Sequence, residues 1–294
     1  FIGSHTVDHL IEQGHDVTVI DIARPKRNDI AWKCVDIRDN ELIKNALQAN
    51  YTYVYMLAAC VNVDHVKRVP VYAMEVNLGG LINVLEACVQ GNVKRILFSS
   101  TVWVYDTCPN TEVSEATPIP IRNPVHIYTA SKVSGESLIR SYHHLYGLEY
   151  TVFRYGIAYG PRASDEIVLS AFIKRGFKRE PLVIYGDGSN YRNFLYVKDH
   201  ARGNVLALND VATNQVINFE GPEKVTISDV ANTVNELFNN QLDIEYKPTR
   251  TADYTGKVVS NEKAYDLLGW RPSVKFRQGA KMHYEWLSRG LVNV

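Results

Sequence analysis

The chain has 294 residues, of which 46% are hydrophobic and 22% charged, and its 32 Lys and Arg residues equal its 32 Asp and Glu residues. This composition is typical of a soluble globular protein of one or two domains, and it excludes a disordered chain, a collagen-like repeat and a disulfide-rich miniprotein. Because the formal net charge is zero, the chain as a whole has no electrostatic attraction to nucleic acid or to an anionic membrane.

The cysteines and the hydropathy pattern indicate a cytoplasmic protein. The four cysteines form no CxxC pair and are too sparse for a disulfide framework. No apolar run approaches the roughly 18 residues that a membrane span needs, and no signal peptide opens the chain. The pair His143-His144 has no carboxylate or Cys at ligand spacing. We therefore expect reduced thiols, no membrane or nucleic-acid partner and no metal site.

The first half of the chain alternates helical patterns with β-rich runs. We predict helices at residues 4–11, 39–49, 71–91 and 128–146, and strands at residues 17–21, 53–57, 95–99 and 150–155. Strands buried on both faces and separated by helices are typical of a parallel sheet with right-handed crossovers. The sequence therefore predicts an α/β fold in which residues 1–155 form a Rossmann-type, doubly wound parallel sheet.

The second half is punctuated more often by Pro and Gly. We predict helices at residues 164–179, 198–209, 226–239, 261–268 and 276–289, and short strands at residues 182–185, 216–219 and 242–246. Residues 156–294 are expected to form mainly a smaller mixed α/β lobe, with some of the chain crossing back to the first domain.

The N-terminal residues match the end of a dinucleotide-binding motif. Phe1-Ile2-Gly3 resembles the end of a glycine-rich turn whose helix N-terminus faces a pyrophosphate, and we expect the preceding strand to be missing from the sequence. Asp21 follows eighteen residues later at the end of a predicted strand, where an acid accepts hydrogen bonds from the adenosine ribose. The acid favours NAD, although the nearby residues Arg24, Lys26 and Arg27 leave NADP open.

A tyrosine and a lysine lie four residues apart in the predicted helix at 128–146. The spacing of Tyr128 and Lys132 puts both side chains on one helix face. An ammonium and an oxidised nicotinamide would stabilise the phenolate and lower its pKa, so Tyr128 could act as a general base towards a hydroxyl. Ser99-Ser100-Thr101 ends the preceding predicted strand, where a hydroxyl could relay the same proton.

With these motifs the chain resembles the extended short-chain dehydrogenases/reductases, and among them the NAD-dependent nucleotide-sugar epimerase/dehydratase family, in its UDP-glucose 4-epimerase-like branch. The resemblance runs from Phe1 to about Leu287. The matching motifs are Phe1-Ile2-Gly3, Val19-Ile20-Asp21, Val35-Asp36-Ile37-Arg38, Leu57-Ala58-Ala59, Asn77-Leu78-Gly79-Gly80, Ser99-Ser100-Thr101, Tyr128-x-x-x-Lys132, Tyr159-Gly160-Pro161, Gly186-Asp187-Gly188, Arg192-Asn193-Phe194 with Asp199, and Leu267-Leu268-Gly269-Trp270.

The resemblance implies roles for the matching residues. The catalytic residues would be Thr101, Tyr128 and Lys132. The cofactor-binding residues would be Phe1, Ile2, Gly3, Asp21, Asp36, Ile37, Leu57, Ala58, Ala59, Asn77, Ser99, Tyr128, Lys132 and Tyr155. The substrate-binding residues would be Thr101, Trp103, Tyr128, Tyr185, Arg192, Arg250 and Asp253. The resemblance also implies that the lobe at 156–294 binds the nucleotide sugar, and that a homodimer forms through the helices at 71–91 and 128–146.

The residues after Thr101 bear on the reaction. Dehydratases of the family carry an Asp-Glu pair there and decarboxylases carry a Glu, whereas this chain has Val102 and Trp103. The resemblance therefore favours 4-epimerisation of a UDP-sugar through a transient 4-keto sugar, with dehydratase, decarboxylase and keto-reductase activities as alternatives. A dinucleotide-sensing regulator is the non-enzymatic alternative, and such sensors typically lose the Tyr or the Lys. Trp103 could wall the sugar pocket or pack in the core.

Overall fold

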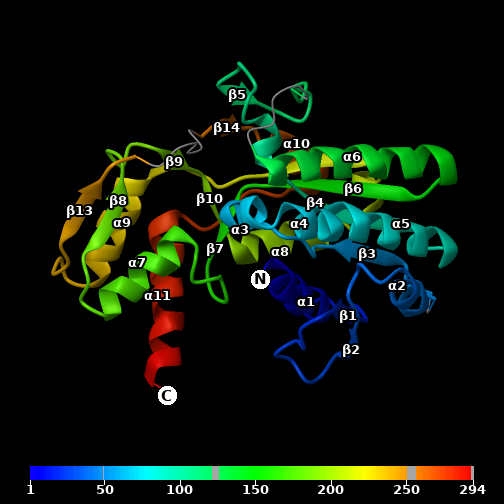
Figure 1. Ribbon diagram of the computed structural model, residues 1–294, viewed down its shortest axis with the longest axis horizontal. Coiled ribbons are helices and arrows are strands. Elements are labelled where there is room, and N and C mark those ends of the chain that lie inside the picture. The colour runs from blue at the N-terminus through cyan, green and yellow to red at the C-terminus, as the bar shows by residue number, and fades with distance from the viewer. Residues whose placement is uncertain (49, 121–125, 250–255, 293–294) are drawn as a thin grey trace.

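A parallel sheet of four strands lies at the centre of the computed structural model, which describes residues 1–48, 50–120, 126–249 and 256–292 (Figure 1). Its order is β11-β6-β4-β3, where β3 is Tyr53–Met56, β4 is Arg95–Thr101, β6 is Glu149–Tyr155 and β11 is Gln215–Phe219. Each pair is parallel. The carboxyl ends of all four strands therefore meet at one edge, which is where ligands bind in open α/β sheets.

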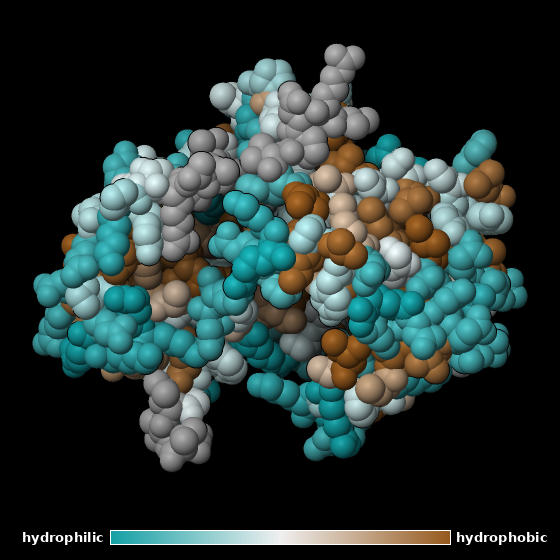
Figure 2. Space-filling view, viewed as in Figure 1, coloured by the Kyte–Doolittle hydropathy of each residue, from teal (hydrophilic) through white to brown (hydrophobic). Residues whose placement is uncertain are grey.

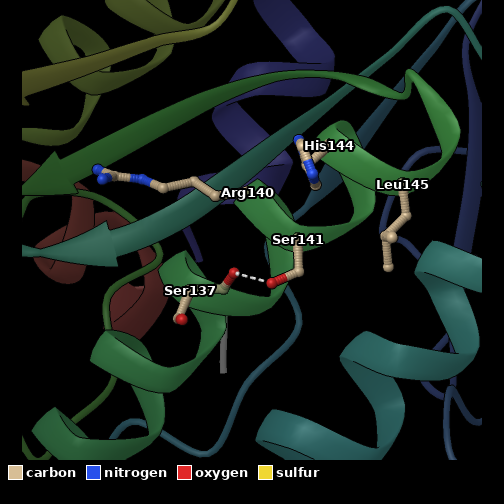
Figure 3. Close-up of a pocket in the computed structure, with 5 residues that line it drawn as sticks. All are labelled: Ser137, Arg140, Ser141, His144 and Leu145. Atoms are coloured by element: carbon tan, nitrogen blue, oxygen red, sulfur yellow. Dashed lines mark hydrogen bonds between the residues drawn. The ribbon is translucent and has the colours of Figure 1, made fainter.

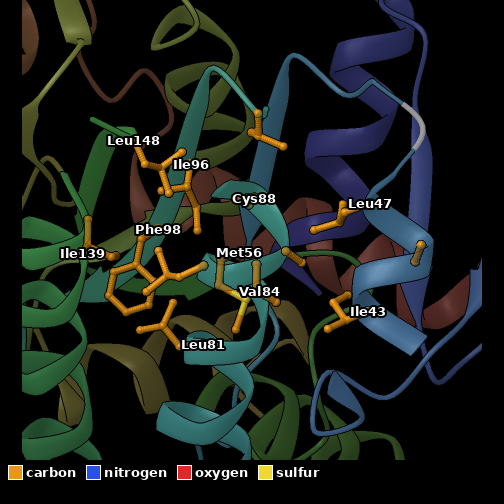
Figure 4. Close-up of a cluster of buried hydrophobic side chains, with 14 of the residues drawn as sticks. Ile43, Leu47, Met56, Leu81, Val84, Cys88, Ile96, Phe98, Ile139 and Leu148 are labelled. Atoms are coloured by element: carbon orange, nitrogen blue, oxygen red, sulfur yellow. The ribbon is translucent and has the colours of Figure 1, made fainter. Parts of the chain in front are cut away.

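Helices cover both faces of this sheet. On one face, α2 (Asn40–Leu47), α5 (Gly80–Gln90) and α6 (Ile127–Tyr146) bury an apolar cluster against β3 and β4, shown in Figure 4. On the other face, Phe219 lies 4.5 Å from the Trp270 ring, in a cluster that also includes residues of β6 and α10 (Glu262–Leu268). The prediction of a doubly wound α/β fold is confirmed.

The elements at the N-terminus flank the sheet. Helix α1 (Ile2–Glu12) packs against α8 (Val197–Leu206). Strands β1 (Thr18–Asp21) and β2 (Ala31–Cys34) pair in parallel with each other, with Asp21 opposite Cys34. Both α8 and β11 come from the second half of the chain, so that half contributes to the structure around the central sheet.

The helix predicted at residues 71–91 is confirmed, but a π-helical turn interrupts it and a separate short helix precedes it. The chain forms α3 (Val63–Arg68), α4 (Pro70–Met74), a π-helical turn (Glu75–Gly79) and then α5. Proline favours the first turn of a helix, and Pro70 lies at the start of α4. A π-helical turn inserts one extra residue into the helical repeat, and this one contains the buried Asn77.

The other group of elements lies beside the sheet and is built around α7 (Val168–Phe177), α9 (Ile227–Leu237) and α11 (Phe276–Val292) (Figure 1). These helices share an apolar cluster with β8 (Leu182–Tyr185), which pairs in parallel with β13 (Ile244–Lys247). Two short pairs complete it: β7 (Ile157–Tyr159) with β10 (Phe194–Tyr196), and β9 (Tyr191–Arg192) with β12 (Val225–Thr226). A further pair, β5 (Glu112–Val113) with β14 (Val258–Val259), lies beside the turn after β4, where Val113 and Val259 share an apolar cluster with Val102.

The division of the chain into a first domain of residues 1–155 and a lobe of residues 156–294 stays a prediction. Among the described helices, none is both long enough and apolar enough to span a bilayer.

Candidate active site

Three predicted catalytic residues lie together at the carboxyl edge of the sheet. Strand β4 ends at Thr101, whose hydroxyl accepts a hydrogen bond from the Trp103 N–H at 3.2 Å and so begins a 3-10 turn over Val102–Tyr105. Tyr128 lies in the first turn of α6, and its hydroxyl lies close enough to the Thr101 side chain for Thr101 to favour the phenolate. One turn further along, the Lys132 ammonium lies 5.9 Å from the centroid of the Tyr128 ring.

Lys132 is fixed by the end of β4. Its Nζ donates to the Ser99 carbonyl oxygen at 2.7 Å and lies 4.9 Å from the centroid of the Phe98 ring. The Ser99 hydroxyl in turn donates to the Met56 carbonyl oxygen of β3 at 3.1 Å. The predicted cofactor residue Ser99 therefore links two central strands to the catalytic helix.

Burial controls the protonation of this pair. It raises the pKa of Tyr128 to about 12, against the opposing effect of the hydrogen bond with Thr101, and it lowers the pKa of Lys132 to about 7. Both shifts arise because desolvation disfavours the charged form of each group. The pKa of Tyr128 is therefore raised in the protein alone, and the lowering expected from the Lys132 ammonium together with an oxidised nicotinamide stays a prediction.

A buried ion pair that sequence reasoning missed lies behind the catalytic residues. Glu136, one turn after Lys132, accepts hydrogen bonds from Arg154 Nε at 3.0 Å and Nη2 at 2.8 Å, and from the Ser100 hydroxyl at 2.6 Å. Arg154 also donates to the Tyr105 hydroxyl at 2.6 Å. The signal was present in the sequence, because Tyr128, Lys132 and Glu136 repeat at intervals of four and share one helix face.

The N-terminus of α1 faces the loop after β3. Phe1 is the N-cap residue, and no side chain caps the first turn. A Cβ added to Gly3 would lie 3.5 Å from Leu57 Cδ1, so the helix comes close to the predicted Leu57–Ala59 segment. Ile2 packs in the cluster that includes Leu57. An uncapped helix N-terminus suits a pyrophosphate, so these residues fit the dinucleotide predicted for them.

Asp21 lies at the end of β1 with an exposed carboxylate, which accepts a hydrogen bond from the Ala23 N–H at 2.9 Å. The basic residues that left NADP open are partly engaged elsewhere. Arg27 contacts Asp29 at 2.5 Å and Asp8 at 2.9 Å. Arg24 lies 5.8 Å from the Trp32 ring. The groups around Asp21 therefore fit a ribose better than a 2′-phosphate, because the two ribose hydroxyls can donate to the Asp21 carboxylate.

Asn77 fastens the loop after β3 to the catalytic helix. Its side chain accepts a hydrogen bond from the Cys60 N–H at 2.7 Å and donates to the Cys60 carbonyl oxygen at 3.0 Å. Its amide also lies 3.1 Å from the hydroxyl of Ser131, the residue before Lys132. The π-helical turn thus places Asn77 where it holds the segment that follows Ala58 and Ala59.

Three other predicted cofactor residues are committed to neighbours. Asp36 accepts two side-chain hydrogen bonds from Arg38, which hold its pKa below the usual range although partial burial opposes this. Ile37 packs where a Cβ on Gly80 would lie only 2.5 Å away. Tyr155 is buried, and its hydroxyl donates to Asn204 Oδ1 at 2.6 Å.

The predicted substrate residues lie on several elements. Half-buried Trp103 stands 6.3 Å from the Tyr128 ring and 5.6 Å from the His126 ring. Arg192 lies on β9 and donates to the Tyr191 carbonyl oxygen at 2.8 Å, and Tyr185 ends β8 with 38% of its surface exposed. Arg250 and Asp253 lie outside the described residues.

A hollow on the surface of α6 lies away from the catalytic residues. Figure 3 shows that one helix provides its lining, Ser137, Arg140, Ser141, His144 and Leu145. Tyr128, which is half-buried, and Lys132, which is buried, lie in the first two turns of the same helix, whereas this hollow lies on its exposed second half. In the part of the chain that the structure describes, no three His, Cys, Asp or Glu side chains gather to hold a metal.

Comparison with known proteins decides the family. Residues 1–219 match the model of the NAD dependent epimerase/dehydratase family. The chain belongs to this family. A putative UDP-glucose 4-epimerase of Methanocaldococcus jannaschii is 32% identical, with 98% of this chain and 95% of the relative covered. The UDP-glucuronic acid decarboxylase 4 of Arabidopsis thaliana is 30% identical over 95% of this chain and 64% of its own length.

A solved structure of the epimerase/dehydratase family has the same fold along the whole chain. The UDP-glucose 4-epimerase of Thermotoga maritima, crystallised with UDP-glucose, superposes with a TM-score of 0.93 at 30% identity, covering 99% of this chain and 96% of that one. The chain is therefore an NAD-dependent enzyme of the epimerase/dehydratase class, which confirms the predicted cofactor and the recognised family.

Proposed function

We propose that this enzyme inverts the configuration at C4 of a nucleotide sugar, with UDP as the nucleotide. The observation that carries the proposal is that Thr101, Tyr128 and Lys132 lie together, with no carboxylate in the two positions after Thr101. Val102 is buried in an apolar cluster and the ring of Trp103 stands against Tyr128. Neither side chain can transfer a proton, whereas expulsion of water or of carbon dioxide needs further acid–base or charge-handling groups.

Tyr128 would act as the general base towards the C4 hydroxyl. NAD, when bound, accepts the hydride from C4 and returns it to the opposite face of the 4-keto sugar. Thr101 lies close to the Tyr128 hydroxyl and would share the proton during the transfer. The reverse transfer from Tyr128 to the C4 oxygen completes the cycle, so no other proton donor is needed.

Lys132 would stabilise the phenolate and orient the cofactor. Its ammonium has three donor hydrogens, of which one goes to the Ser99 carbonyl oxygen. The other two would be available to ribose hydroxyls of the cofactor and to the Tyr128 phenolate. Ser99 and Thr101 both belong to β4, so the same strand holds the Lys132 ammonium and Thr101 in place.

The second group of elements would hold the rest of the substrate. Arg192 would grip the diphosphate, for which a planar guanidinium is suited, together with Arg250, and Tyr185 would line the nucleotide site with Asp253. Trp103 would form a wall of the sugar pocket, because its half-buried ring packs against the apolar cluster of Val102 and Tyr105 and also lies edge-to-face with the base Tyr128.

A homodimer is supported by the outer surface of α4, α5 and α6. Figure 2 shows apolar side chains gathered over these helices, including Val71 (72% exposed), Ile82, Leu145 (66% exposed) and Tyr146. Exposed apolar patches of this kind mark protein interfaces. A second copy of the chain would cover them through α5 and α6, including the hollow in Figure 3.

The test is product analysis by NMR after incubation of the purified enzyme with UDP-, dTDP-, GDP- and CDP-sugars. The proposal predicts a mixture of two C4 epimers of one UDP-sugar with no accumulation of reduced cofactor at 340 nm. An unsaturated, decarboxylated or reduced product would contradict it, and so would binding of NAD with no change in any sugar, which is the behaviour of a sensor.

A further inference from the structure

We propose that residues 160–167, here called the strap, close the cofactor cleft, and that contacts at its two ends set the rate at which NAD leaves. The strap follows β7 and leads into α7. The inference rests on the proposed function in one respect, namely that α1 and the loop after β3 hold the dinucleotide.

One end of the strap is fastened to α1. His5 Nε2 lies 2.8 Å from the Pro161 carbonyl oxygen, to which it donates. One turn further along, Asp8 Oδ2 accepts a hydrogen bond from the Arg162 guanidinium at 2.6 Å. These contacts join residues more than 150 positions apart in the sequence, on the helix whose N-terminus would face the pyrophosphate.

The other end is fastened to the opposite wall of the cleft. Asn62, two residues after Cys60, donates from its side-chain amide to Glu166 Oε2 at 2.5 Å. The orientation of Asn62 is fixed because its Oδ1 also accepts the His65 N–H at 2.8 Å and so caps α3. The strap therefore contacts both elements that would enclose the dinucleotide, α1 on one side and the loop after β3 on the other.

The backbone of the strap adopts a left-handed conformation at Arg162, and the contacts of the strap stabilise it. Arg162 has a φ of 69°, in the left-handed region that residues other than Gly, Asn and Asp rarely adopt. The turn is closed by a hydrogen bond from the Ala163 N–H to the Gly160 carbonyl oxygen at 3.1 Å. The pairing of Arg162 with Asp8 offsets this strain, so the closed strap depends on the ion pair.

Asp8 also connects the strap to the adenosine end of the cleft. Its second oxygen accepts from Arg27, which lies in the segment after Asp21. Burial alone would raise the pKa of Asp8, but hydrogen bonds from Arg27 and Arg162 lower it, so the carboxylate is charged at neutral pH. An enzyme that regenerates its cofactor in every turnover gains from such retention, because loss of the cofactor in its reduced form would leave the sugar stranded as a ketone.

The experiment measures NAD dissociation directly in the absence of sugar. Purified enzyme loaded with NAD is mixed in a stopped-flow instrument with a large excess of 1,N6-etheno-NAD, and the fluorescence change gives the release rate. Glu166→Ala removes one anchor and Asp8→Asn weakens the other. We expect each variant to release NAD about threefold faster or more, and the double variant about tenfold faster, since one anchor is an ion pair and the other is a hydrogen bond from an amide to a carboxylate, both at partly exposed sites.

Two control variants match the anchors. Asp165→Ala replaces the residue before Glu166. The ion pair that it breaks, with Lys174 of α7, lies within the same lobe and does not join the strap to α1 or to the loop after β3. Asp29→Asn breaks the other contact of Arg27 and leaves the pairing of Asp8 with Arg162 intact. Both are expected to release NAD at the wild-type rate, and an equal increase in these controls would overturn the inference.

The inference is also overturned if the folded double variant, with a wild-type melting temperature, releases NAD at the wild-type rate. Because the readout is release of the cofactor, it does not depend on which sugar is converted or on which reaction follows. Failure of the NMR test with normal strap behaviour would count against 4-epimerisation alone, and an unchanged release rate with epimerised product would count against the strap alone.

Discussion

The Lys132 ammonium donates to the Ser99 carbonyl oxygen at 2.7 Å, and this contact fastens the catalytic helix to the end of the central strand. It places a cation inside a nearly water-free site, where Lys132 is only 3% exposed. The protein alone holds the pKa of this group near 7 because burial disfavours its charge. The charge balance of this site is therefore completed only when a partner is bound, which agrees with a cofactor that stays in place.

Replacement of Tyr128 by Phe is expected to lower turnover at least about 100-fold, because the side chain loses the only group that can take the C4 proton. NAD binding should persist, since the ring still fills the same space. Turnover is measured by NMR and bound NAD by its absorbance after gel filtration. Full activity in the Phe variant would show that another group is the base.

Lys132 should make the stability of the protein depend on pH. Its folded-state pKa lies below its unfolded value of 10.5, so the unfolded state binds more protons between pH 7 and 10.5 and the free energy of unfolding rises with pH in that range. Relative to Lys132→Met, the wild type should gain up to about 1.4 kcal/mol per pH unit from pH 7 to 9. Urea denaturation at pH 7, 8 and 9 checks this, and parallel curves for the two proteins would contradict it.

Glu136→Gln should destabilise the fold by about 3 kcal/mol, because it leaves Arg154 buried without its carboxylate partner. The surface variant Glu41→Gln, which breaks an exposed ion pair with Lys44, should cost less than about 0.5 kcal/mol. Denaturant unfolding of both variants gives the comparison. Equal effects would mean that the buried pair does not carry the stability assigned to it.

Trp103→Ala should raise KM for the sugar nucleotide about tenfold, because the pocket loses a wall beside Tyr128, while Trp103→Phe should retain most of the affinity. NAD binding should be unchanged in both variants. If Trp103 were only a core residue, the Ala variant would lose stability with no change in KM, which thermal melting and steady-state kinetics together distinguish.

Much of the fold could be predicted because the signals are local. The strand at 95–99 and the helix at 128–146 appear as β4 and α6 with shifts of one or two residues at their ends, since apolar runs and helical periodicity mark buried elements. The four-residue spacing of Tyr128 and Lys132 likewise placed both on one helix face. The two-residue strands, such as β9 and β14, were missed because their pairing depends on partners distant in sequence.

The parts of the site that could not be predicted also depend on contacts between segments distant in sequence. The π-helical turn that directs Asn77 to Cys60 has no sequence signature in the helical pattern at 71–91. The contacts of Asp8 with Arg162 and of Asn62 with Glu166 join segments more than 100 residues apart, so no local pattern in the sequence indicates them. The lowered pKa of Lys132 was missed because burial, rather than spacing, determines it.

The central claim is that Tyr128 and NAD act on the same carbon and return its hydride to the other face. The most direct measurement uses a UDP-sugar carrying deuterium at C4, with the products analysed by NMR. The account predicts a C4 epimer that keeps the deuterium at C4, because the hydride never leaves the site. Deuterium lost to solvent, or found at any other carbon, would contradict it.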